Sequence, residues 1–371
     1  MNQAPRSNQG SHRFQAFEFS HLPGWESDDH LAAFRAFCDS APALAKSSAP
    51  VAAELAALLR HTDISGISDA HAARSFFENN FTPHRIVSGE NSGLLTGYYE
   101  PEILASREKI AGFEVPVLSR PPDLVNLMDE AQRGALSGQM THARRLDSGD
   151  LEPYATRQQI DEGALRGRGL ELMYVADAVD LFFMQVQGSG LARLTDGTAL
   201  RLIYDGKNGH NYTSIGKYLI ETGQFTPEDM TLQALIDWLK ADPERARPVL
   251  WQNESYVFFR ILGPESETRT LGTYEIPLTP LRSVAVDTAC YCLGMPIFIS
   301  VPGLAHIDEC FSPDFNRLMV AHDVGSAIRG PERGDLFYGS GQKAGAKAGV
   351  TKHPVHFYAL FPNETASARS P

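Results

Sequence analysis

The chain has 371 residues, of which 43% are hydrophobic and 21% are charged, and its formal net charge is −12. This length allows two domains, or one domain with a large insertion, and the composition is that of a folded globular protein. The negative charge argues against nucleic acid as a partner, because phosphate backbones are bound by clusters of Lys and Arg. A neutral or mixed-charge ligand fits better.

The ends of the chain carry few apolar side chains, and we expect residues 1–14 and 364–371 to be disordered tails. The first of these stretches also lacks the apolar core and cleavage site of a secretory signal. No run of about 18 apolar residues occurs anywhere, so no transmembrane segment is expected.

Helices are predicted near the N-terminus at residues 28–37, 49–60 and 69–79. Further along, strands are predicted at residues 169–175, 181–186 and 198–204. Thr213 or Ser214 suits the start of a helix that ends at Gly223. Another helix is predicted to begin at Thr226, where Pro and two acidic residues follow, and to be stopped by Pro243.

From residue 94 onward short β segments separated by Gly and Pro become frequent, and they dominate the chain after Pro248. Predicted strands there cover residues 257–260, 283–286, 296–300, 318–321 and 355–360. Many short strands at close spacing favour a closed barrel over an open sheet. The fold class is therefore expected to be mainly β with N-terminal helices.

The segment 322–341 is the most informative part of the sequence, because it places Asp323 and Asp335 at opposite ends of a glycine-rich turn. Two apolar residues follow Asp335, so we expect its carboxyl group to be only partly hydrated, which raises its pKa. A raised pKa suits a general acid near neutral pH. A Gly-Asp turn without a catalytic function is the alternative.

Asp323 is assigned a supporting role, because the amides of Val324 and Gly325 directly after it suit a turn in which the carboxylate accepts hydrogen bonds. His322 could act as a general base, but we favour the interpretation that it lies on an edge strand and faces solvent.

Two other strings combine polar and aromatic residues. In Thr-Gly-Tyr-Tyr-Glu-Pro, the adjacent Tyr98 and Tyr99 point to opposite faces of a strand, so that one packs while the other lines a groove. In Met-Gln-Val-Gln-Gly-Ser-Gly, Gln185 and Gln187 are expected on one face of a strand. Amide and hydroxyl groups beside tyrosines suit the hydroxyl and N-acetyl groups of sugars.

Four cysteines are too few for a disulfide-built scaffold. A metal site drawing on Cys290, Cys292, Cys310 and His306 is conceivable, but the spacing matches no zinc template and we favour buried free thiols. The sequence lacks Gly-x-Ser-x-Gly, His-Glu-x-x-His and the glycine motifs of nucleotide sites. We therefore expect neither a metal nor a cofactor.

Seven strings in order along the chain resemble the membrane-bound lytic murein transglycosylase A (MltA) family. They lie at residues 22–25, 95–101, 185–190, 206–210 with 214–216, 253–259, 276–283 and 322–341. One such string is a weak indication, but seven in sequence are highly specific. The resemblance covers nearly the whole chain, although His322 and Ser326 stand where the family often has Gln and Gly.

The resemblance implies a double-ψ β-barrel domain built from residues 1–101 and 248–371, interrupted by a second β-rich domain at residues 102–247. A long groove between the two domains would hold a glycan strand. The C-terminal part resembles the three-aspartate (3D) module of the family, in which Asp287, Asp323 and Asp335 fall at matching places.

The implied activity is that of a lyase which cleaves the β-1,4 bond between N-acetylmuramic acid and N-acetylglucosamine in peptidoglycan and leaves a 1,6-anhydro end. In such enzymes a single aspartate does the chemistry, and its position matches Asp335, as general acid and then base. Asp323 and Asp287 are assigned supporting roles. The expected groove contacts are Thr96, Tyr98, Gln187, Ser189 and Tyr204.

The implied substrate places the enzyme in the periplasm, associated with the cell wall or the outer membrane. Peptidoglycan strands are its expected partner, and cell-wall synthesis proteins are conceivable further partners. The lipoprotein signal that is usual in the family is missing, so either the start is truncated or misassigned, or the enzyme is held at the wall in another way.

Two alternatives stay open. One is an inverting glycoside hydrolase in which Asp335 is the acid and Asp323 activates a water, which needs carboxyl groups about 6.5–9.5 Å apart. The other is a non-catalytic glycan-binding barrel, which would release nothing soluble from murein.

Overall fold

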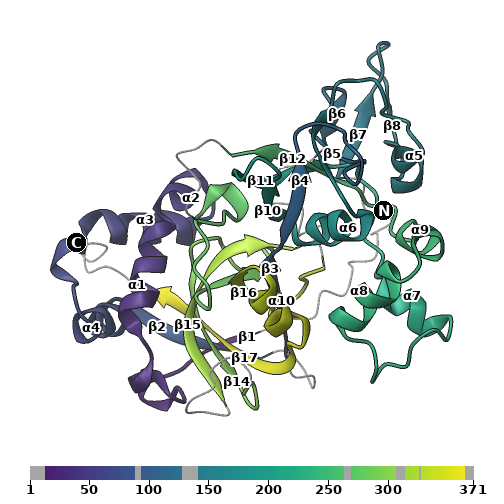
Figure 1. The fold of residues 1–371 in the computed structure, drawn as a ribbon. Coiled ribbons are helices and arrows are strands. Elements are labelled where there is room, and N and C mark those ends of the chain that lie inside the picture. The colour runs from purple at the N-terminus through teal and green to yellow at the C-terminus, as the bar shows by residue number, and fades with distance from the viewer. Residues whose placement is uncertain are drawn as a thin grey trace, which may run out of the picture.

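The computed structural model describes residues 13–87, 93–127, 141–262, 269–305, 314–325 and 327–363. Apart from residues 13 and 14, the two expected tails lie outside these ranges. Figure 1 shows the N-terminal helices on one side of a barrel and a second sheet with its own helices on the other side.

Six of the described strands close into a barrel. In order around the ring they are β17 (Lys352–Pro362), β14 (Pro296–Val301), β15 (Phe315–Val324), β13 (Ser283–Val286), β16 (Arg333–Ser340) and β3 (Gly93–Glu100). The ring is complete because β3 pairs with β17 as well as with β16. The barrel predicted from the strand spacing is confirmed. Two more strands, β2 (Phe81–Val87) and β1 (Arg13–Ala16), extend the sheet beyond β17.

The predicted N-terminal helices are confirmed, and they cover one side of the barrel. They are α1 (His30–Asp39), α3 (Pro50–His61) and α4 (Ala70–Asn80), with a short α2 (Ala41–Lys46) between the first two. Buried aromatic rings such as Phe37, Phe77 and Phe298 join helices and strands in one apolar core. A buried ion pair also fixes this layer, because Arg282 at the start of β13 donates to both carboxylate oxygens of Asp28, at 2.7 and 2.9 Å.

The middle of the chain forms a second sheet. Its strands, in spatial order, are β12 (Val257–Ile261), β11 (Ala199–Lys207), β10 (Ser189–Leu194), β4 (Glu102–Ser106), β9 (Glu171–Val175) and β5 (Val115–Leu118). The expected domain boundary at residue 247 falls inside helix α9 (Pro243–Leu250), and β12 beyond it pairs with β11 rather than with the barrel. The second sheet therefore extends to residue 261.

Smaller elements complete this part of the molecule. They are a three-stranded sheet of β6 (Leu124–Asn126), β7 (His142–Arg145) and β8 (Leu151–Glu152), and the helices α5 (Arg157–Asp161), α6 (Ala178–Gln187), α7 (Ile215–Glu221) and α8 (Leu232–Lys240). Apolar side chains of α6 to α9 form a core of their own.

The strand predicted at residues 181–186 is wrong, because these residues belong to helix α6. Asp177 caps the start of this helix, and Gly188 ends it in the left-handed conformation with φ of 82°. Its residues 181–185 are all buried. A helix that is buried nearly all round shows no apolar face in its sequence, so a short apolar run could not be distinguished from a strand.

Ser214 caps α7 as predicted. The next helix starts later than expected, because α8 is capped by Thr231 and not by Thr226. The hydroxyl of Thr226 instead contacts the side chain and the amide of Asp229, which closes a turn. Pro243 lies in the first turn of α9, where its missing N–H has no helical partner to lose.

His322 does not face solvent, and the expectation of an exposed edge strand is wrong. Its strand β15 lies between β14 and β13, and its side chain is 0% exposed. Its Nε2 lies 3.0 Å from Ser40 Oγ and its Nδ1 lies 2.7 Å from Ser283 Oγ. Burial lowers the pKa of His322 to about 3, so the ring is neutral and joins the end of α1 to the barrel.

We expect His322→Gln to make the fold more resistant to acid. The unfolded histidine binds a proton with a pKa near 6.5 and the folded one only near 3, so the folded state loses stability as the pH falls between these values. Glutamine offers a polar group to each serine but takes up no proton. Between pH 7.5 and pH 5 the wild type should lose about 2 kcal/mol of unfolding free energy that the variant keeps. Urea unfolding of both proteins at the two pH values measures this difference, and equal losses would show that another group titrates.

Candidate active site

One row of side chains across the barrel brings the two acidic residues of segment 322–341 together. Ala285 of β13 lies opposite Asp323 of β15 on one side and opposite Asp335 of β16 on the other. Asp335 in turn lies opposite Thr96 of β3. Residues directly opposite one another share a face of the sheet, so both carboxyl groups project to the same side. Two strand spacings separate their backbones by roughly 9.6 Å.

Asp335 is half-buried, and one of its oxygens is engaged. The hydroxyl of Thr96 donates to Oδ1 at 2.6 Å. Burial raises the pKa of Asp335 to about 6, and the neighbouring Asp323 adds to the rise, whereas Thr96 and Arg333 oppose it. The raised pKa predicted from the apolar neighbours is confirmed. A carboxyl group with a pKa of about 6 is protonated in about a tenth of the molecules at pH 7, compared with about a thousandth for an ordinary aspartate.

Asp323 is held more tightly than Asp335. Its Oδ1 accepts hydrogen bonds from Val324 N at 2.9 Å, Thr273 N at 3.0 Å and Thr273 Oγ1 at 2.8 Å. Its Oδ2 accepts from the hydroxyl of Tyr98 at 3.1 Å. Burial raises the pKa of Asp323, and these donors oppose the rise. Of the two expected donors, Val324 and Gly325, only Val324 is among these partners, and Thr273 was missed because it lies in a distant loop.

Asp287 lies outside the row that contains Asp323 and Asp335, which we call the row of acids. It is 6% exposed, and its carboxylate accepts from Ala289 N at 3.0 Å and from Gly330 N at 2.7 Å. These bonds join the segment after β13 to the loop that leads into β16. Asp287 thus fixes the loop that precedes Asp335 in the chain, but its side chain does not contact Asp335 in this structure.

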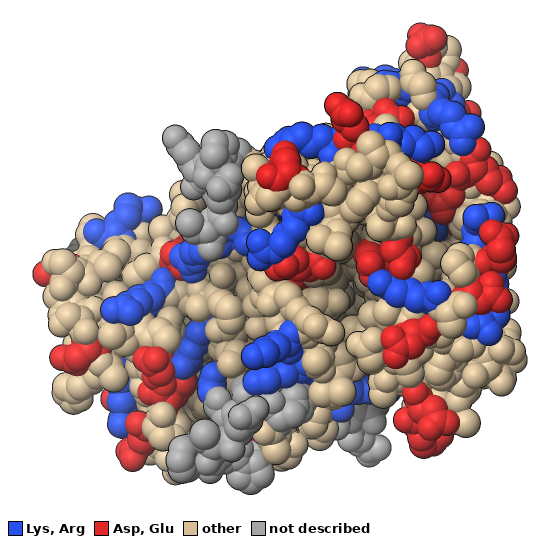
Figure 2. Space-filling model, in the orientation of Figure 1, with Lys and Arg blue, Asp and Glu red and all other residues tan. Residues whose placement is uncertain are grey.

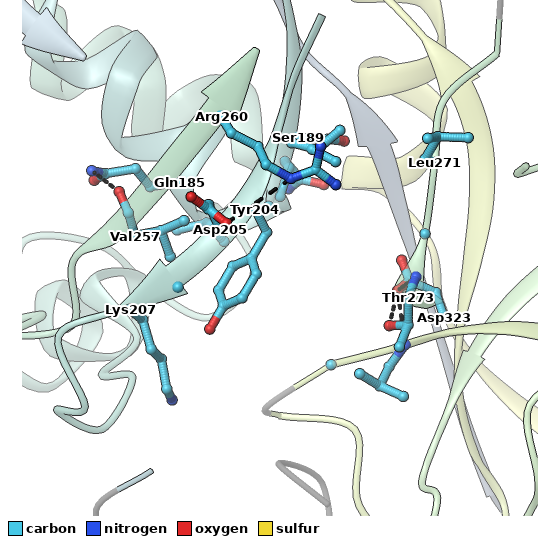
Figure 3. A pocket seen from close by; sticks show the side chains of 18 of the residues that line it. Gln185, Ser189, Tyr204, Asp205, Lys207, Val257, Arg260, Leu271, Thr273 and Asp323 are labelled. Carbon is cyan, nitrogen blue, oxygen red and sulfur yellow. Dashed lines mark hydrogen bonds and ion pairs between the residues drawn. The ribbon is translucent and has the colours of Figure 1, made fainter. Parts of the chain in front are cut away.

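A cleft with a volume of about 500 Å³ opens between the barrel and the second sheet. Figure 3 shows Tyr204 and Lys207 extending into it from the second sheet, with Thr273 and Asp323 on the opposite wall. Asp323 therefore connects the cleft to the row of acids. A hollow is visible between the two parts in Figure 2.

Three of the five expected groove residues line this cleft, namely Gln187, Ser189 and Tyr204. The Oε1 of Gln187 also accepts a hydrogen bond from Tyr99 N at 3.1 Å, which links α6 to β3. The other two, Thr96 and Tyr98, are not part of the lining and instead donate to Asp335 and Asp323.

Gln185 is not a partner of Gln187 on one strand face, because both lie on helix α6. The amide of Gln185 accepts from Arg157 Nη1 at 2.6 Å and donates to the carbonyl of Val257 at 3.0 Å. It is only 4% exposed, so its bonds hold β12 against the helix. Gln185 therefore stabilises the wall of the cleft.

Both signs of charge line the cleft. Its cationic residues include Lys46, Arg120, Lys207 and Arg260, and its acidic residues are Asp205, Glu275 and Asp323. The pair of Arg260 and Glu275 joins β12 to the loop that carries Thr273. In that loop Tyr274 and Glu275 both adopt positive φ, 56° and 62°, which strains residues with side chains.

A buried ion pair joins the barrel to the second sheet. Arg201 of β11 donates to both oxygens of Glu100 at the end of β3, at 2.8 and 3.1 Å. Ser340 of β16 adds a third bond to Glu100 at 2.7 Å. Both charged side chains are almost fully buried, at 7% and 0% exposure. The sequence predicted neither this pair nor Arg333, although Arg333 stands two positions before Asp335, the spacing of one strand face.

Cys38, Cys290 and Cys292 are free, partly buried thiols whose pKa burial raises. In the ranges that the structure describes, no group of three or more His, Cys, Asp or Glu could hold a metal ion. Cys310 and His306 fall outside those ranges. Among the described helices, none combines the length and apolar character needed to cross a bilayer.

Comparison with family models gives two matches. The model described as the MltA specific insert domain matches residues 94–260, and the model described as the 3D domain matches residues 282–361. Membrane-bound lytic murein transglycosylase A of Vibrio cholerae is 36% identical over 274 residues, which are 72% of this chain and 66% of the relative. The protein of the same name from Escherichia coli K12 is 36% identical over 70% of this chain and 62% of the relative. The chain thus spans slightly less than two thirds of these curated relatives.

Solved structures match over nearly the whole chain. A membrane-bound lytic murein transglycosylase from Agrobacterium tumefaciens has a TM-score of 0.84 and 35% identity, covering 96% of this chain and 99% of that one. MltA from E. coli with bound chitohexaose has a TM-score of 0.69 and 27% identity, covering 96% and 97% of the two chains.

We expect Arg201→Met to destabilise the fold strongly, because it leaves the carboxylate of Glu100 buried without its cation. Removing one partner of a buried ion pair costs about 3–5 kcal/mol. The matched control is Arg193→Met, since Arg193 of β10 pairs with Glu102 at the surface, where the two side chains are 53% and 37% exposed. Urea unfolding should show a far smaller loss for the control. Equal losses would mean that burial of the Glu100 pair is unimportant for stability.

Proposed function

The chain belongs to the membrane-bound lytic murein transglycosylase A family, and from this premise we propose that it cleaves the β-1,4 bond between N-acetylmuramic acid and N-acetylglucosamine in peptidoglycan. The products carry 1,6-anhydro-N-acetylmuramic acid ends. The observation that carries the proposal is Asp335, a half-buried carboxyl group with a pKa of about 6 in the row of acids. The E. coli relative with bound chitohexaose supports a glycan strand as the ligand.

The proposed reaction begins with transfer of the Asp335 proton to the glycosidic oxygen. The bond from this oxygen to C1 of the muramic residue breaks through an oxocarbenium-like transition state. The C6 hydroxyl of the same residue then adds to C1, and its proton goes to the Asp335 carboxylate, which restores the acid. Because the nucleophile belongs to the substrate, no activated water and no second base are needed.

The hydrogen bonds of the two acids favour this lyase reaction over hydrolysis. A base that activates water must present an unoccupied lone pair to it, and an ionised carboxylate has about four acceptor positions. Asp323 accepts three described hydrogen bonds on Oδ1, from Val324 and Thr273, and one on Oδ2, from Tyr98, so that only one position, on Oδ2, is left for a water. Its proposed role is to hold the loop of Thr273 and to keep Asp335 protonated.

We assign the glycan strand to the cleft between the barrel and the second sheet. Gln187, Ser189 and Tyr204 line its wall and are the proposed sugar contacts. The six-stranded barrel is proposed to be of the double-ψ type, with residues 102–261 as the inserted domain. This division is supported by β4 to β12, which pair only with one another or within the small sheet in the part of the chain described here.

The proposed place of action is the periplasm, at the cell wall or the outer membrane. This is supported by the peptidoglycan substrate and by the name "membrane-bound" that the curated relatives carry. Cell-wall synthesis proteins are proposed as further partners, because they work on the same strands.

Digestion of intact murein sacculi tests the proposal. The wild type should release muropeptides with 1,6-anhydro ends, and Asp335→Asn should be about 100- to 10,000-fold slower because it cannot donate the proton. Mass spectrometry identifies the ends, and an unchanged urea unfolding curve controls for the fold. Reducing-end muramic acid, which is heavier by one water, would instead identify a hydrolase. Release of nothing soluble by the wild type would identify a binding protein.

Asp323→Asn should be much less severe than Asp335→Asn. The amide keeps an oxygen for the donors of Thr273 but removes the negative charge that helps to keep Asp335 protonated. We expect a loss of about tenfold, equivalent to one pKa unit of interaction between the two acids. The same digest measures it. Complete loss of turnover in a well-folded Asp323→Asn protein would contradict this division of roles.

A further inference from the structure

The side chains of Arg333, Thr96 and Asp335 form a chain of hydrogen bonds with one direction. Arg333 Nη2 lies 2.9 Å from Thr96 Oγ1, and Thr96 Oγ1 lies 2.6 Å from Asp335 Oδ1. A guanidinium group carries only donors, so the oxygen of Thr96 must accept from Arg333. The single hydroxyl proton of Thr96 is then directed at Asp335. An ionised Asp335 can only accept, so the order is fixed in that state, and a protonated Asp335 keeps the order when its proton lies on Oδ2.

We propose that Thr96 and Arg333 are positioning residues which confine the transferable proton of Asp335 to its Oδ2 atom and fix the orientation of the carboxyl group. The proposal rests on the proposed function, since that function makes Asp335 the proton donor. Because one lone pair of Oδ1 accepts from Thr96, a proton on that side of Oδ1 would face the hydroxyl proton, whereas Oδ2 has no such competitor among the described bonds. The acid therefore offers one oxygen to the substrate instead of two.

The fold holds each member of this chain of hydrogen bonds, the relay from Arg333 through Thr96 to Asp335, in place. Thr96 and Asp335 are directly paired in the parallel register of β3 and β16. Arg333 precedes Asp335 by two positions on β16, so that both side chains lie on one face. The guanidinium group of Arg333 also donates to the backbone carbonyls of Leu94, at 3.3 Å, and Gly334. These contacts of Nη1 fix the plane of the guanidinium group, so that Nη2 reaches Thr96.

The relay also sets the strength of the acid. When Asp335 ionises, the hydrogen bond from Thr96 becomes charge-assisted and roughly twice as strong. Thr96 and Arg333 therefore stabilise the carboxylate, against the effects of burial and of Asp323. The charged and titratable groups near Asp335 are Asp323 on β15, Tyr98 on β3, Arg333 and Tyr338 on β16, and Lys352 on β17 opposite Thr96. On β13 the facing residue is Ala285, which does not titrate.

Thr96→Val and Thr96→Ser form the matched test, because valine keeps the shape of threonine without its hydroxyl and serine keeps the hydroxyl. The first measurement is an NMR titration of the Asp335 side-chain carboxyl in the substrate-free protein with ¹³C-labelled aspartate, assigned with Asp335→Asn. Thr96→Val should raise the pKa of Asp335 by about one to two units, the range of a hydrogen bond to a charged group. Thr96→Ser should leave it within about 0.3 units of the wild type.

Arg333→Met provides a second route to the same result. Methionine removes both the donor to Thr96 and the positive charge, so the pKa of Asp335 should rise here too, while Arg333→Lys should restore part of the difference. If both Thr96→Val and Arg333→Met left the titration of Asp335 unchanged, the relay would be refuted. This outcome is informative even if one of the variants folds poorly.

The second measurement is the pH profile of kcat/KM for murein digestion. For a proton donor, the rate falls as the pH rises through its pKa. In Thr96→Val this alkaline limb should move upward by the same amount as the titration, and the plateau should fall because a weaker acid donates less readily. A merely structural role of Thr96 would lower the plateau without moving the limb. If the wild type digests no murein but the titration still shifts, the proposed function fails and the relay stands.

Discussion

The pairing of β13 with β15 on one side and β16 on the other is the constraint on which the site depends. It places Asp323, Ala285, Asp335 and Thr96 in one row across four strands. A slip of one residue would turn either aspartate to the opposite face of the sheet. Polar bonds at the start of β13 oppose such a slip, because Arg282 binds Asp28 and Ser283 binds His322. The buried ion pair of Arg282 with Asp28 and the neutral His322 thus help to keep Asp323 and Asp335 on the same face of the sheet.

The three aspartates differ in how many hydrogen bonds they accept, and this difference separates their roles. Asp323 accepts four described hydrogen bonds, from two backbone amides and two hydroxyl groups, and Asp287 accepts two, both from backbone amides, so both hold loops. Asp335 accepts one described bond, from Thr96. Carboxylates with several donors are stabilised in the ionised form, whereas a buried carboxyl with one donor keeps a proton more readily. The proposed acid, Asp335, is the aspartate with the fewest described hydrogen bonds.

The sequence predicted those features that depend on local pattern. The barrel followed from many short strands, the N-terminal helices from apolar periodicity, and the raised pKa of Asp335 from its apolar neighbours. Helix α6 was missed because five consecutive buried residues, 181–185, hide the periodicity that identifies a helix. His322 was misplaced because its partners, Ser40 and Ser283, are brought to it only by the closed barrel.

The contacts around the acids could not be predicted for the same reason. Thr96 and Asp335 lie side by side because β3 pairs with β16 in parallel register. A pairing between strands so distant in the sequence cannot be predicted from a local pattern. The family resemblance did direct attention to Thr96 and Tyr98, but as sugar contacts. Their side chains bind the two aspartates, and neither residue is part of the cleft lining.

Strand β3 connects this chemistry to the second sheet. Alternate residues Thr96, Tyr98 and Glu100 bind Asp335, Asp323 and Arg201 respectively. The other face of the strand is covered closely by helix α10 (Gln342–Gly349), since a Cβ on Gly97 would lie 2.9 Å from the backbone of Ala348. The strand is therefore pressed between α10 and the site, and it continues through Pro101 directly into β4. The strand that carries the partners of both acids is thus continuous with the second sheet, and it is bound to that sheet a second time by the ion pair of Glu100 with Arg201.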